Sequence, residues 1–392
     1  MIKNITLVTQ YFAPAWSYGG PPRALFTLAR QLINQGINIK VITTDVLDEN
    51  RNTTLNETLD GIEIIRFKTI SNYLAYKMKL IIAPHVLEKS KEIIQQSDVV
   101  LFSDVRAIIN WQLYSLVYNA KIPYGIFAFG EMPYEEGIKA QVKIIMDIFW
   151  VKDFVKKATY RFAQTVHEQT MFNVYFGIPI KDTQLLPLPI DFDQQQIDED
   201  LFYKYKKKWG INSDDQVILF VGRLHYLKGI DLLISAVTPL FRDNSHLKLL
   251  IVGRDDGEES KLHGFTSKEL KNRVIFTGPL YEKEAIYAYS LASCFVITPR
   301  FYEETSLASL EALSYGVPVI VSRQADIPCL EEYQAGYVVD NDSDSIKKAV
   351  IRILEKVKKD KKQVKANSQR LISDKFSASQ VAEKLSSMIS RS

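Results

Sequence analysis

Residues 5 to 43, ITLVTQYFAPAWSYGGPPRALFTLARQLINQGINIKVIT, carry the pattern that decides the fold. The stretch begins with the short apolar run Ile5 to Val8, and a turn rich in glycine and proline follows. Arg23 to Gln35 has the spacing of an amphipathic helix, Gly36 is a typical helix stop, and Ile39 to Thr43 is a second apolar run. Strand, helix and strand in this order predict a βαβ unit, whose two strands lie parallel in one sheet.

The first half of the chain continues this alternation. Helical patterns separate further strand candidates, which lie at Ile62 to Phe67, Val99 to Phe102, Tyr124 to Phe129 and Phe162 to Val166. Such an alternation is typical of a parallel sheet that helices cover on both faces. We therefore expect the first half to form one doubly wound α/β domain.

A second domain is indicated by a break in the periodicity at Leu186-Pro-Leu-Pro-Ile-Asp191, where prolines cluster and the polar run Gln194 to Gln196 follows. The strand candidates then resume at Val217 to Val221, Leu247 to Val252, Val274 to Thr277, Cys294 to Thr298 and Val317 to Val321. We expect an amino-terminal domain over residues 1–190, a second doubly wound domain over 191–372, and a helix over 373–392 that crosses back to the first domain.

Composition excludes several classes of protein. The chain has 392 residues, 46% hydrophobic and 24% charged, as globular proteins do, and this length favours two domains. A formal net charge of +3 is too small to indicate a nucleic-acid binder. The two cysteines, Cys294 and Cys329, have neither zinc-like spacing nor a disulfide pattern. Because disulfides are rare in the reducing cytoplasm, a cytoplasmic location is expected. No signal-peptide core is visible, and no stretch reaches the roughly 20 apolar residues of a spanning helix.

The strongest chemical signal is Pro299-Arg-Phe-Tyr-Glu-Glu-Thr-Ser-Leu-Ala-Ser-Leu-Glu-Ala-Leu-Ser-Tyr-Gly-Val-Pro-Val319. A helix is expected to begin near Thr305, with Glu303 at its start and Glu311 in its interior. The amino terminus of a helix can hold a diphosphate or a sugar oxygen through unpaired N–H groups, and carboxylates suit vicinal hydroxyls. Taken alone, the two glutamates would instead be interpreted as a helix-dipole partner and a solvated side chain.

A second signal is Phe220-Val-Gly-Arg-Leu-His-Tyr-Leu-Lys-Gly-Ile-Asp231, in which a strand runs into a glycine turn and a helix. Gly222, Arg223 and Lys228 lie at the carboxyl end of this strand, where open α/β sheets bind ligands. Two cations there suit a diphosphate, unless both are ordinary surface residues. Because such cations can stabilise departing charge without a metal, and the five histidines form no ligand cluster, we expect metal independence and no cofactor.

The loop Tyr18-Gly-Gly-Pro-Pro-Arg23 is a weaker third signal. Gly19 and Gly20 allow the backbone to approach a ligand closely, and Pro22 suits the first turn of a helix. The loop is not the GxGxxG fingerprint of a dinucleotide enzyme, which argues against a dehydrogenase. Thr165 to Glu168 fits a capping box, so Glu168 and its neighbour His167 are expected to be structural.

Together these motifs resemble glycosyltransferase family 4, the glycosyl transferases group 1. The resemblance is carried by the Glu, seven residues, Glu spacing of Glu303 and Glu311, by Gly316-Val-Pro-Val319, and by the order Gly-Arg-Leu, three residues, Lys-Gly. It covers nearly the whole chain and is densest in the second domain. It implies the GT-B fold, two Rossmann-like doubly wound domains facing across a cleft. It also implies a hexosyltransferase that moves a sugar from a nucleotide-diphosphate donor to a hydroxyl acceptor with retention of configuration.

The resemblance further implies roles for single residues. Arg223 and Lys228 stabilise the leaving diphosphate and Glu303 binds the donor sugar, which makes these three the expected catalytic residues. Glu311 is expected to bind the ribose, and the loop that follows Gly278 to approach the base. The full set of expected donor contacts is Gly19, Gly20, Gly222, Gly278, Leu280, Thr305, Ser306, Leu307 and Glu311.

Two positions depart from the family pattern, and both concern the acceptor side. Phe129 stands where many relatives have a His before the glycine, and Pro187-Leu-Pro189 stands where Pro-Asn-Gly is usual. Two alternatives to a transferase therefore stay open. One is a GT-B-fold sugar-nucleotide epimerase, and the other is a non-catalytic nucleotide-sugar-binding subunit, which Phe129 alone supports.

The family frequently uses lipid-linked acceptors in bacterial surface-polysaccharide assembly, which includes O-antigen, capsule and exopolysaccharide. The resemblance thus implies a lipid-linked glycan acceptor and a peripheral position on the inner face of the cytoplasmic membrane. The segment Lys139 to Arg161 suits an anionic surface, because basic and apolar side chains interleave in it. The basic ones are Lys139, Lys143, Lys152, Lys156, Lys157 and Arg161, and the apolar ones are Ile144, Ile145, Ile148, Phe149, Trp150, Phe154 and Val155. In the alternative interpretation the aromatic side packs on the first domain's sheet.

Overall fold

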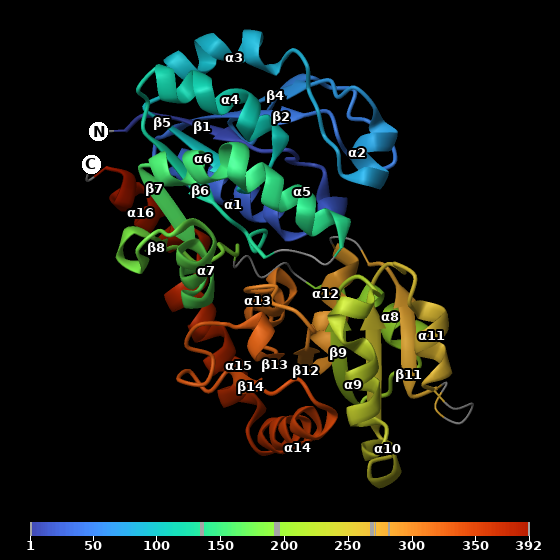
Figure 1. Cartoon of the computed structure of the whole chain (residues 1–392). Coiled ribbons are helices and arrows are strands. Elements are labelled where there is room, and N and C mark those ends of the chain that lie inside the picture. Colours follow the sequence, from blue (N-terminus) through green and yellow to red (C-terminus); the bar gives the residue numbers. More distant parts are fainter. Residues whose placement is uncertain are drawn as a thin grey trace. The chain divides into compact units, whose positions relative to one another are not determined.

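The computed structural model describes residues 2–133, 137–191, 197–266, 270, 272–280 and 283–390, and of Ile138, Lys139 and Lys283 the backbone alone. The chain forms two compact units (Figure 1). Unit 1 contains Met1–Asp191 and Ser377–Ser392, and unit 2 contains Phe192–Phe376. The division thus falls one residue after the expected boundary at 190 and four residues after the one at 372. The polar run Gln194 to Gln196 lies outside the described residues.

The core of unit 1 is an eight-stranded sheet in the order β3-β4-β2-β1-β5-β6-β7-β8, in which the β3–β4 pair is antiparallel and the other pairs are parallel. The strands are β1 (Asn4–Val8), β2 (Asn38–Thr44), β3 (Asn56–Leu59), β4 (Ile62–Phe67), β5 (Val99–Ser103), β6 (Tyr124–Phe127), β7 (Tyr160–Ala163) and β8 (Gln184–Leu185). The two expected strands nearest the carboxyl side are corrected. The strand expected to reach Phe129 ends at Phe127, and the one expected over 162–166 ends at Ala163.

The second of these corrections has a local cause. Thr165 caps the amino terminus of a helix, and its side chain accepts a hydrogen bond from the Glu168 N–H at 3.0 Å. The helix α7 (Val166–Phe176) therefore takes the residues that had been expected to extend the strand. The cap at Thr165 is as predicted, and the Glu168 carboxylate accepts hydrogen bonds from the N–H groups of Gln164 and Gly130.

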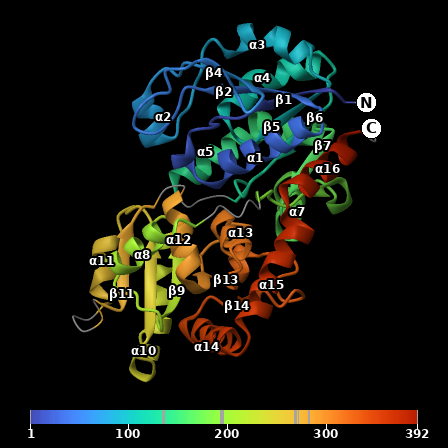
Figure 2. The same ribbon diagram turned by 180° about the vertical axis from the view of Figure 1, so that it is seen from behind.

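Helices cover both faces of the unit 1 sheet because its strands alternate their side chains. Ile5 and Leu7 of β1 pack with α1 (Gly20–Asn34) and with α16 (Ala378–Ile389), and Figure 2 shows these two helices beside each other. Val8 of the same strand belongs to the core on the other face. That core includes residues of α3 (Val86–Gln95), α4 (Ile108–Asn119), α6 (Lys152–Lys157) and α7. The remaining helical segments are η1 (Trp16–Tyr18), α2 (Asn72–Met78), α5 (Ile138–Met146), the π-helical turn η2 (Asp147–Val151) and η3 (Ile180–Asp182).

Unit 2 is built on a six-stranded sheet in the order β11-β10-β9-β12-β13-β14, and all of its pairs are parallel. The strands are β9 (Gln216–Val221), β10 (Leu247–Val252), β11 (Val274–Gly278), β12 (Ala292–Ile297), β13 (Val319–Ser322) and β14 (Gly336–Val339). The first strand of unit 2 in the chain, β9, lies inside the sheet, between β10 and β12. The order of the strands reverses there, and open α/β sheets bind their ligands at the carboxyl end of such a point.

The helices of unit 2 follow its strands in the way the alternation predicts. Helix α14 packs against α9 and along β12, β13 and β14, whereas α13 packs against β12, β13 and α15. The helical segments are α8 (Glu199–Lys208), η4 (Tyr226–Lys228), α9 (Ile230–Val237), α10 (Leu240–Asp243), α11 (Glu259–Gly264), α12 (Lys283–Leu291), α13 (Leu307–Ser314), η6 (Arg323–Ala325), α14 (Ser343–Lys359), α15 (Lys361–Leu371) and η7 (Ile372–Phe376). Two parallel-sheet α/β units are thus present, and the fold class inferred from the sequence is confirmed.

Candidate functional site

The loop after β9 presents the first group of expected site residues. It leaves the sheet at Gly222, passes the exposed Arg223, and ends in the short helix η4, whose last residue is Lys228. Gly229 follows in the left-handed conformation with φ 66°, and a Cβ at this position would overlap the carbonyl oxygen of Thr298. The loop therefore lies directly against the end of β12, which requires glycine here.

Lys228 meets Glu303 at this point. The Lys228 Nζ is 2.6 Å from the Glu303 Oε2, and the two side chains are 18% and 22% exposed. The two residues were expected to bind neighbouring parts of one donor, and the structure brings them into contact. A half-buried ion pair of this kind keeps both charged groups at the carboxyl edge of the sheet, where a ligand can replace either partner.

Arg300 holds the two loops together, and the sequence analysis missed its role. Its Nη2 lies 2.6 Å from the Asp231 Oδ2, and its Nη1 donates to the Tyr226 carbonyl oxygen at 2.7 Å. Its backbone N–H also donates to Leu227 at 2.8 Å. The hydrogen bond to Asp231 raises the pKa of the Arg300 guanidinium. The available signal was its position, because Arg300 lies three residues after the end of β12 and Asp231 is the last residue of the glycine-turn motif.

Arg223 lies apart from this pair. Its Nη1 contacts the Asp256 Oδ2 at 2.8 Å, and the two side chains are 56% and 34% exposed. Exposed ion pairs contribute little to stability, about 0 to 1 kcal/mol, so this one can open for an anionic ligand. The structure does not bring Arg223 into contact with Lys228 or Glu303.

The helix expected to begin near Thr305 begins at Leu307, with Ser306 as its amino-terminal cap. Glu304, two residues before the cap, is buried and adopts the left-handed φ of 57°, which lies outside the helical range. Glu303 therefore lies in the loop before α13, where its N–H donates to the Gln324 carbonyl oxygen at 2.8 Å. The Ser306 side chain makes no capping hydrogen bond among the described residues, so the first turn of α13 can present N–H groups to a ligand.

Glu311 lies in the interior of α13, as expected, and has a partner that the sequence analysis missed. Its Oε2 accepts a hydrogen bond from the Tyr289 hydroxyl at 2.7 Å. The Tyr289 ring stacks on Tyr315 with centroids 5.6 Å apart. Burial and then the charge of Glu311 raise the pKa of Tyr315. The carboxylate is thus held by a buried tyrosine, and nothing in the α12 pattern distinguished that tyrosine from a core residue.

Three glycines bring the loops of β9, β10 and β11 together at the same edge. A Cβ on Gly253, the residue after β10, would overlap the Gly222 carbonyl oxygen. The Gly253 N–H donates to the carbonyl oxygen of Gly278 at 3.1 Å, and Gly278 has φ 73°. Leu280 follows two residues later and is half-buried. Gly222, Gly278 and Leu280 were expected site residues, whereas Gly253 was missed although it directly follows a strand.

Unit 1 has its own set of polar groups at the carboxyl ends of its strands. Gly19, with φ 93°, precedes α1, and Gly20 is the first residue of that helix. Asp104 follows β5 with φ 69° and accepts hydrogen bonds from the Gln10 Nε2 at 3.1 Å and the Arg106 N–H at 2.9 Å. Burial raises the pKa of the Asp104 carboxyl. The sequence analysis missed Asp104, a carboxylate placed directly after an apolar strand.

The described part of the chain lacks two kinds of feature. No group of three or more His, Cys, Asp or Glu side chains there could hold a metal ion. Likewise, none of the helices in the described ranges combines the length and the apolar character that crossing a bilayer requires.

Sequence comparison identifies a family match and several relatives. The family described as glycosyl transferases group 1 matches residues 202–370. An uncharacterized glycosyltransferase of Methanocaldococcus jannaschii is 31% identical over 152 residues, 38% of this chain and 38% of that protein. A D-inositol 3-phosphate glycosyltransferase of Corynebacterium glutamicum is 32% identical over 145 residues, 35% of this chain and 34% of that one. An alpha-monoglucosyldiacylglycerol synthase of Streptococcus pneumoniae is 25% identical over 142 residues, 36% and 32% of the two chains. Each of these three matches spans about a third of the length of the relative.

Similar solved structures extend over both units. Sucrose-phosphate synthase from Thermosynechococcus elongatus superposes with a TM-score of 0.77 at 18% identity, over 99% of this chain and 98% of that one. The Anabaena protein HepE, in a complex with UDP and glucose, gives 0.73 at 17% identity over 100% of both chains. These likenesses show the fold, which is that of the GT-B glycosyltransferases. The resemblance recognised in the sequence is confirmed for residues 202–370, which match the glycosyl transferases group 1 family.

Proposed function

We propose that this protein transfers a sugar from a nucleotide-diphosphate donor to a hydroxyl acceptor, with retention of anomeric configuration. The contact between Lys228 and Glu303, next to the start of α13, is the observation that carries the proposal. It combines a cation for phosphate, a carboxylate for sugar hydroxyls and a helix amino terminus on two adjoining loops. HepE, which has the same fold, was solved with UDP and glucose, and this supports a nucleotide sugar as the ligand.

The proposed reaction requires no protein nucleophile. The bond between the sugar C1 and the diphosphate oxygen breaks while a bond from C1 to the acceptor oxygen forms on the same face. The acceptor proton passes to the leaving phosphate. Lys228 and Arg223, the latter released from Asp256, stabilise the charge that grows on the diphosphate. Glu303 orients the donor sugar, and Glu311 binds the ribose.

The experiment that tests this proposal is a screen of nucleotide sugars by thermal shift, followed by product analysis with and without alkyl glycosides as acceptors. A ligand at 100 times its Kd adds about 2.7 kcal/mol of apparent stability. We expect a stabilising donor, a glycoside product of retained configuration, and a loss of turnover of about 10² to 10³ in Lys228→Ala. Isomerised donor without acceptor would indicate an epimerase, and stabilisation without any product would indicate a binding subunit.

We further propose that the acceptor is a lipid-linked glycan, approached from the membrane surface. The support comes from the continuous helical segment of α5, η2 and α6, which exposes large apolar side chains. Phe149 is 81% exposed and Ile148 is 66% exposed, and the exposed Lys152 and Lys156 follow on the same segment. The S. pneumoniae relative is named for a glucosylated diacylglycerol, a lipid. Apolar side chains beside lysines suit an anionic bilayer surface.

Each of the two interpretations of the segment Lys139 to Arg161 fits a part of it. Phe154 and Val155 are fully buried in the unit 1 core, where Phe154 packs on Phe102 and Tyr124. Arg161 is also buried, and its guanidinium donates to the carbonyl oxygens of residues 155 and 156. The side chain of Lys139 lies outside the described residues. The proposed membrane surface therefore consists of Val142, Ile144, Ile145, Ile148, Phe149, Lys152, Lys156 and Lys157.

Sedimentation with vesicles tests the membrane proposal. Binding should rise with the fraction of anionic lipid and fall with added salt. It should also fall when Lys152, Lys156 and Lys157 are changed together to Gln. The matched control changes Lys204, Lys207 and Lys208 of α8 to Gln, which removes the same charge from unit 2. Equal binding of both triple variants, or binding indifferent to anionic lipid, would contradict the proposal.

A further inference from the structure

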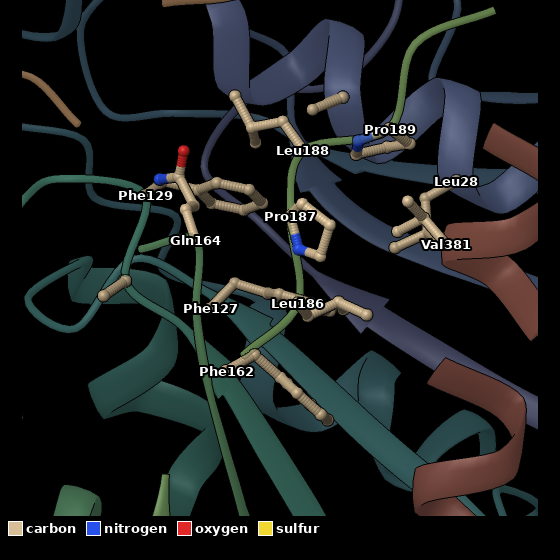
Figure 3. Close-up of a pocket in the computed structure, with 12 residues that line it drawn as sticks. Leu28, Phe127, Phe129, Phe162, Gln164, Leu186, Pro187, Leu188, Pro189 and Val381 are labelled. Atoms are coloured by element: carbon tan, nitrogen blue, oxygen red, sulfur yellow. The ribbon is translucent and has the colours of Figure 1, made fainter. Parts of the chain in front are cut away.

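The space between Phe129 and Leu188 in unit 1 is nearly filled by packing. Figure 3 shows the Phe129 ring pointing toward Pro187 and Leu188, and the three residues line a cavity of about 10 Å³. Phe129 stands where a His is usual, and Leu188 stands where the Asn of Pro-Asn-Gly is usual. The two departures from the family pattern therefore meet in one apolar region, whose cavity holds at most one group of the size of a water molecule.

A much larger groove, of about 220 Å³, lies in unit 2 at the amino-terminal ends of β12 and β13. Ala292, the first residue of β12, and Pro318, the residue before β13, belong to its lining. The expected donor residues lie at the opposite, carboxyl edge of this sheet. Since β12 has six residues, the two edges are about 20 Å apart along it. The groove is therefore separate from the candidate donor site.

The motif Gly316-Val-Pro-Val319 carries part of the family resemblance but has no role in the donor site. Its first three residues line the groove. Gly316 has φ 80°, and a Cβ at this position would overlap the Lys365 Cγ. The aliphatic stem of Lys365 is thus packed against the chain directly after α13, which restricts the positions that its ammonium group can take.

Two lysines of α15, one helical turn apart, line the groove. Lys361 and Lys365 are exposed, and neither forms an ion pair with another described residue. Six of the ten residues 356–365 are lysines, and the one acidic residue, Asp360, accepts a hydrogen bond from the Gln363 N–H at 2.9 Å. This side of the groove is therefore positively charged, and two ammonium groups suit a dianion such as a phosphate monoester.

The rest of the lining combines hydroxyl groups with apolar surface. Ser290 and Ser293 are half-buried. The Ser290 Oγ donates to the Ile286 carbonyl oxygen at 2.8 Å and can still accept a hydrogen bond, whereas the Ser293 Oγ accepts from the Val217 N–H at 3.2 Å and can still donate. Tyr315 is half-buried too. A sugar has both hydroxyl groups and an apolar ring face, so it suits such a lining.

Tyr289 connects the groove with Glu311. It lines the groove, and its hydroxyl donates to the Glu311 Oε2 at 2.7 Å. Its ring stacks on Tyr315, which also lines the groove, with centroids 5.6 Å apart. A ligand that packs beside these two rings restricts the carboxylate that they hold. Nucleotide binding at Glu311 then loses less conformational freedom and becomes tighter.

We propose that this groove is a regulatory site for a phosphorylated sugar. The phosphate binds Lys361 and Lys365, the ring lies on the apolar lining near Tyr315, and an occupied groove strengthens nucleotide binding at Glu311. The volume corresponds to roughly seven water molecules at about 30 Å³ each, which suits a monosaccharide. The effect on the nucleotide rests on the proposed function, whereas binding in the groove does not.

Calorimetry on the full chain tests the site. The probes are glucose 6-phosphate and ribose 5-phosphate, and the controls are glucose and inorganic phosphate. Saturating UDP, or the nucleoside diphosphate that the thermal-shift screen identifies, occupies the donor site throughout. At least one phosphorylated sugar should bind about tenfold or more tightly than either control, because it uses the lysines and the lining together. Equal affinity for inorganic phosphate would indicate an adventitious ion only, and that result, like absent binding of both probes, overturns the proposal.

Variants connect binding to the groove. Lys361→Gln with Lys365→Gln should weaken the preferred probe by about 100-fold. The matched control, Lys359→Gln with Lys362→Gln, removes the same charge from α14 and α15 at positions that do not line the groove, and should weaken it less than about threefold. Ser290→Met should also prevent binding, because it fills the groove without changing the charge. Equal weakening in both double variants overturns the proposal, since only diffuse charge then acts. A lowered thermal midpoint with unchanged Kd in the first variant overturns it as well.

Reciprocal titrations test the link to Glu311. The Kd of UDP should fall about fivefold or more when the phosphorylated sugar is saturating, and the Kd of that sugar should fall by the same factor in UDP. Tyr289→Phe keeps the ring and should bring this factor close to one. Displacement of the sugar by UDP overturns the proposal, because the ligand then occupies the donor site, and independent binding overturns the regulatory role. If no nucleoside diphosphate binds, the proposed function fails, while titration with the phosphorylated sugars alone still tests the groove.

Discussion

At the residue scale, Arg300 connects the two loops that carry Lys228 and Glu303. The shape of its guanidinium matters for this connection as much as its positive charge does. Its guanidinium reaches Asp231 and the Tyr226 carbonyl oxygen at once, and it lies 4.1 Å from the centroid of the Tyr226 ring. A lysine keeps the charge but has no planar fork that can reach both partners. We therefore expect Arg300→Lys to lower kcat/KM about tenfold or more while the protein stays folded.

The control for that substitution is Arg323→Lys. Arg323 also forms an arginine–carboxylate pair, with Asp340 at 2.9 Å, but its side chain is 65% exposed. We expect this variant to retain full turnover and an unchanged thermal midpoint. If Arg300→Lys behaves in the same way, Lys228 and Glu303 keep their positions without Arg300.

Glu303 and Glu311 should separate in their effects on ligand binding. Glu311→Ala is expected to weaken binding of the free nucleoside diphosphate by about 1.5 to 3 kcal/mol, because a ribose contact is lost whether or not a sugar is present. Tyr289→Phe should weaken the same ligand by a smaller amount, since it removes the hydrogen bond that holds Glu311. Glu303→Ala should spare the free nucleotide and weaken the intact nucleotide sugar. Calorimetry with both ligands checks the assignment, and the reverse pattern would exchange the two roles.

At the scale of elements, the π-helical turn η2 is held by a buried ion pair. The Arg106 Nε and Nη2 lie 2.8 and 2.9 Å from the two carboxylate oxygens of Asp147, the first residue of η2, whose side chain is 0% exposed. Removing one partner of such a pair costs about 3 to 5 kcal/mol, because the other charge stays buried alone. We expect Arg106→Met to lower the free energy of unfolding by that amount in urea titrations.

The double substitution Arg106→Met with Asp147→Leu tests the cause. The double variant should recover part of the lost free energy of unfolding, because neither charge is then left buried alone. The recovery should be incomplete, because the carbonyl oxygens of Glu131 and Met132 lose the Arg106 donor. The comparison pair Lys157 and Asp153 is exposed, and Lys157→Met should leave the midpoint unchanged. A double variant as unstable as Arg106→Met would show that the charge balance is not the cause.

The elements that sequence could predict are those with a strong apolar pattern. The buried strands β1, β2, β5, β9 and β10 each contain an apolar run, and their positions agree with expectation within one or two residues. Strand β3 was missed because Asn56–Leu59 is polar and half-exposed at the edge of the sheet, and β8 because it is two residues long. The turn η2 was missed because a lone Asp147 is typical of a surface position. Its partner in the fold, Arg106, is 41 positions away in the sequence.

At the scale of the whole molecule, the candidate site shows the same limit. The motifs predicted which residues gather at the carboxyl edge of the unit 2 sheet, because those residues follow strands or begin helices. The sequence could not predict partners that depend on tertiary packing, such as Tyr289 for Glu311 or Asp256 for Arg223. It also could not show that Phe129 and Leu188 line one cavity, because strand order in the sheet determines which distant loops meet.

The last helix, α16, gives a prediction for the molecule as a whole. Although it follows unit 2 in sequence, Val381, Leu385 and Ile389 belong to the core of unit 1. The Tyr160 hydroxyl donates to the Ile389 carbonyl oxygen at 2.9 Å, and the Ala378 N–H donates to Ile190 at 3.1 Å. Three such side chains contribute roughly 5 kcal/mol or more when buried, which is comparable with the entire stability of a domain at about 5 to 15 kcal/mol.

Deleting residues 377–392 should therefore unfold unit 1 and spare unit 2. Limited proteolysis with mass spectrometry should cut the truncated chain throughout 1–191 while 197–376 stays resistant, and calorimetry should still detect nucleoside diphosphate binding. Leu385→Ala should reproduce part of the effect, about 2 to 5 kcal/mol, whereas Gln380→Ala on the exposed side of α16 should leave unit 1 intact. If unit 1 of the truncated chain keeps full protease resistance, α1 and the sheet form a stable core without α16. If the deletion unfolds both units together, the stability of unit 2 depends on unit 1 in a way that burial within each unit does not explain.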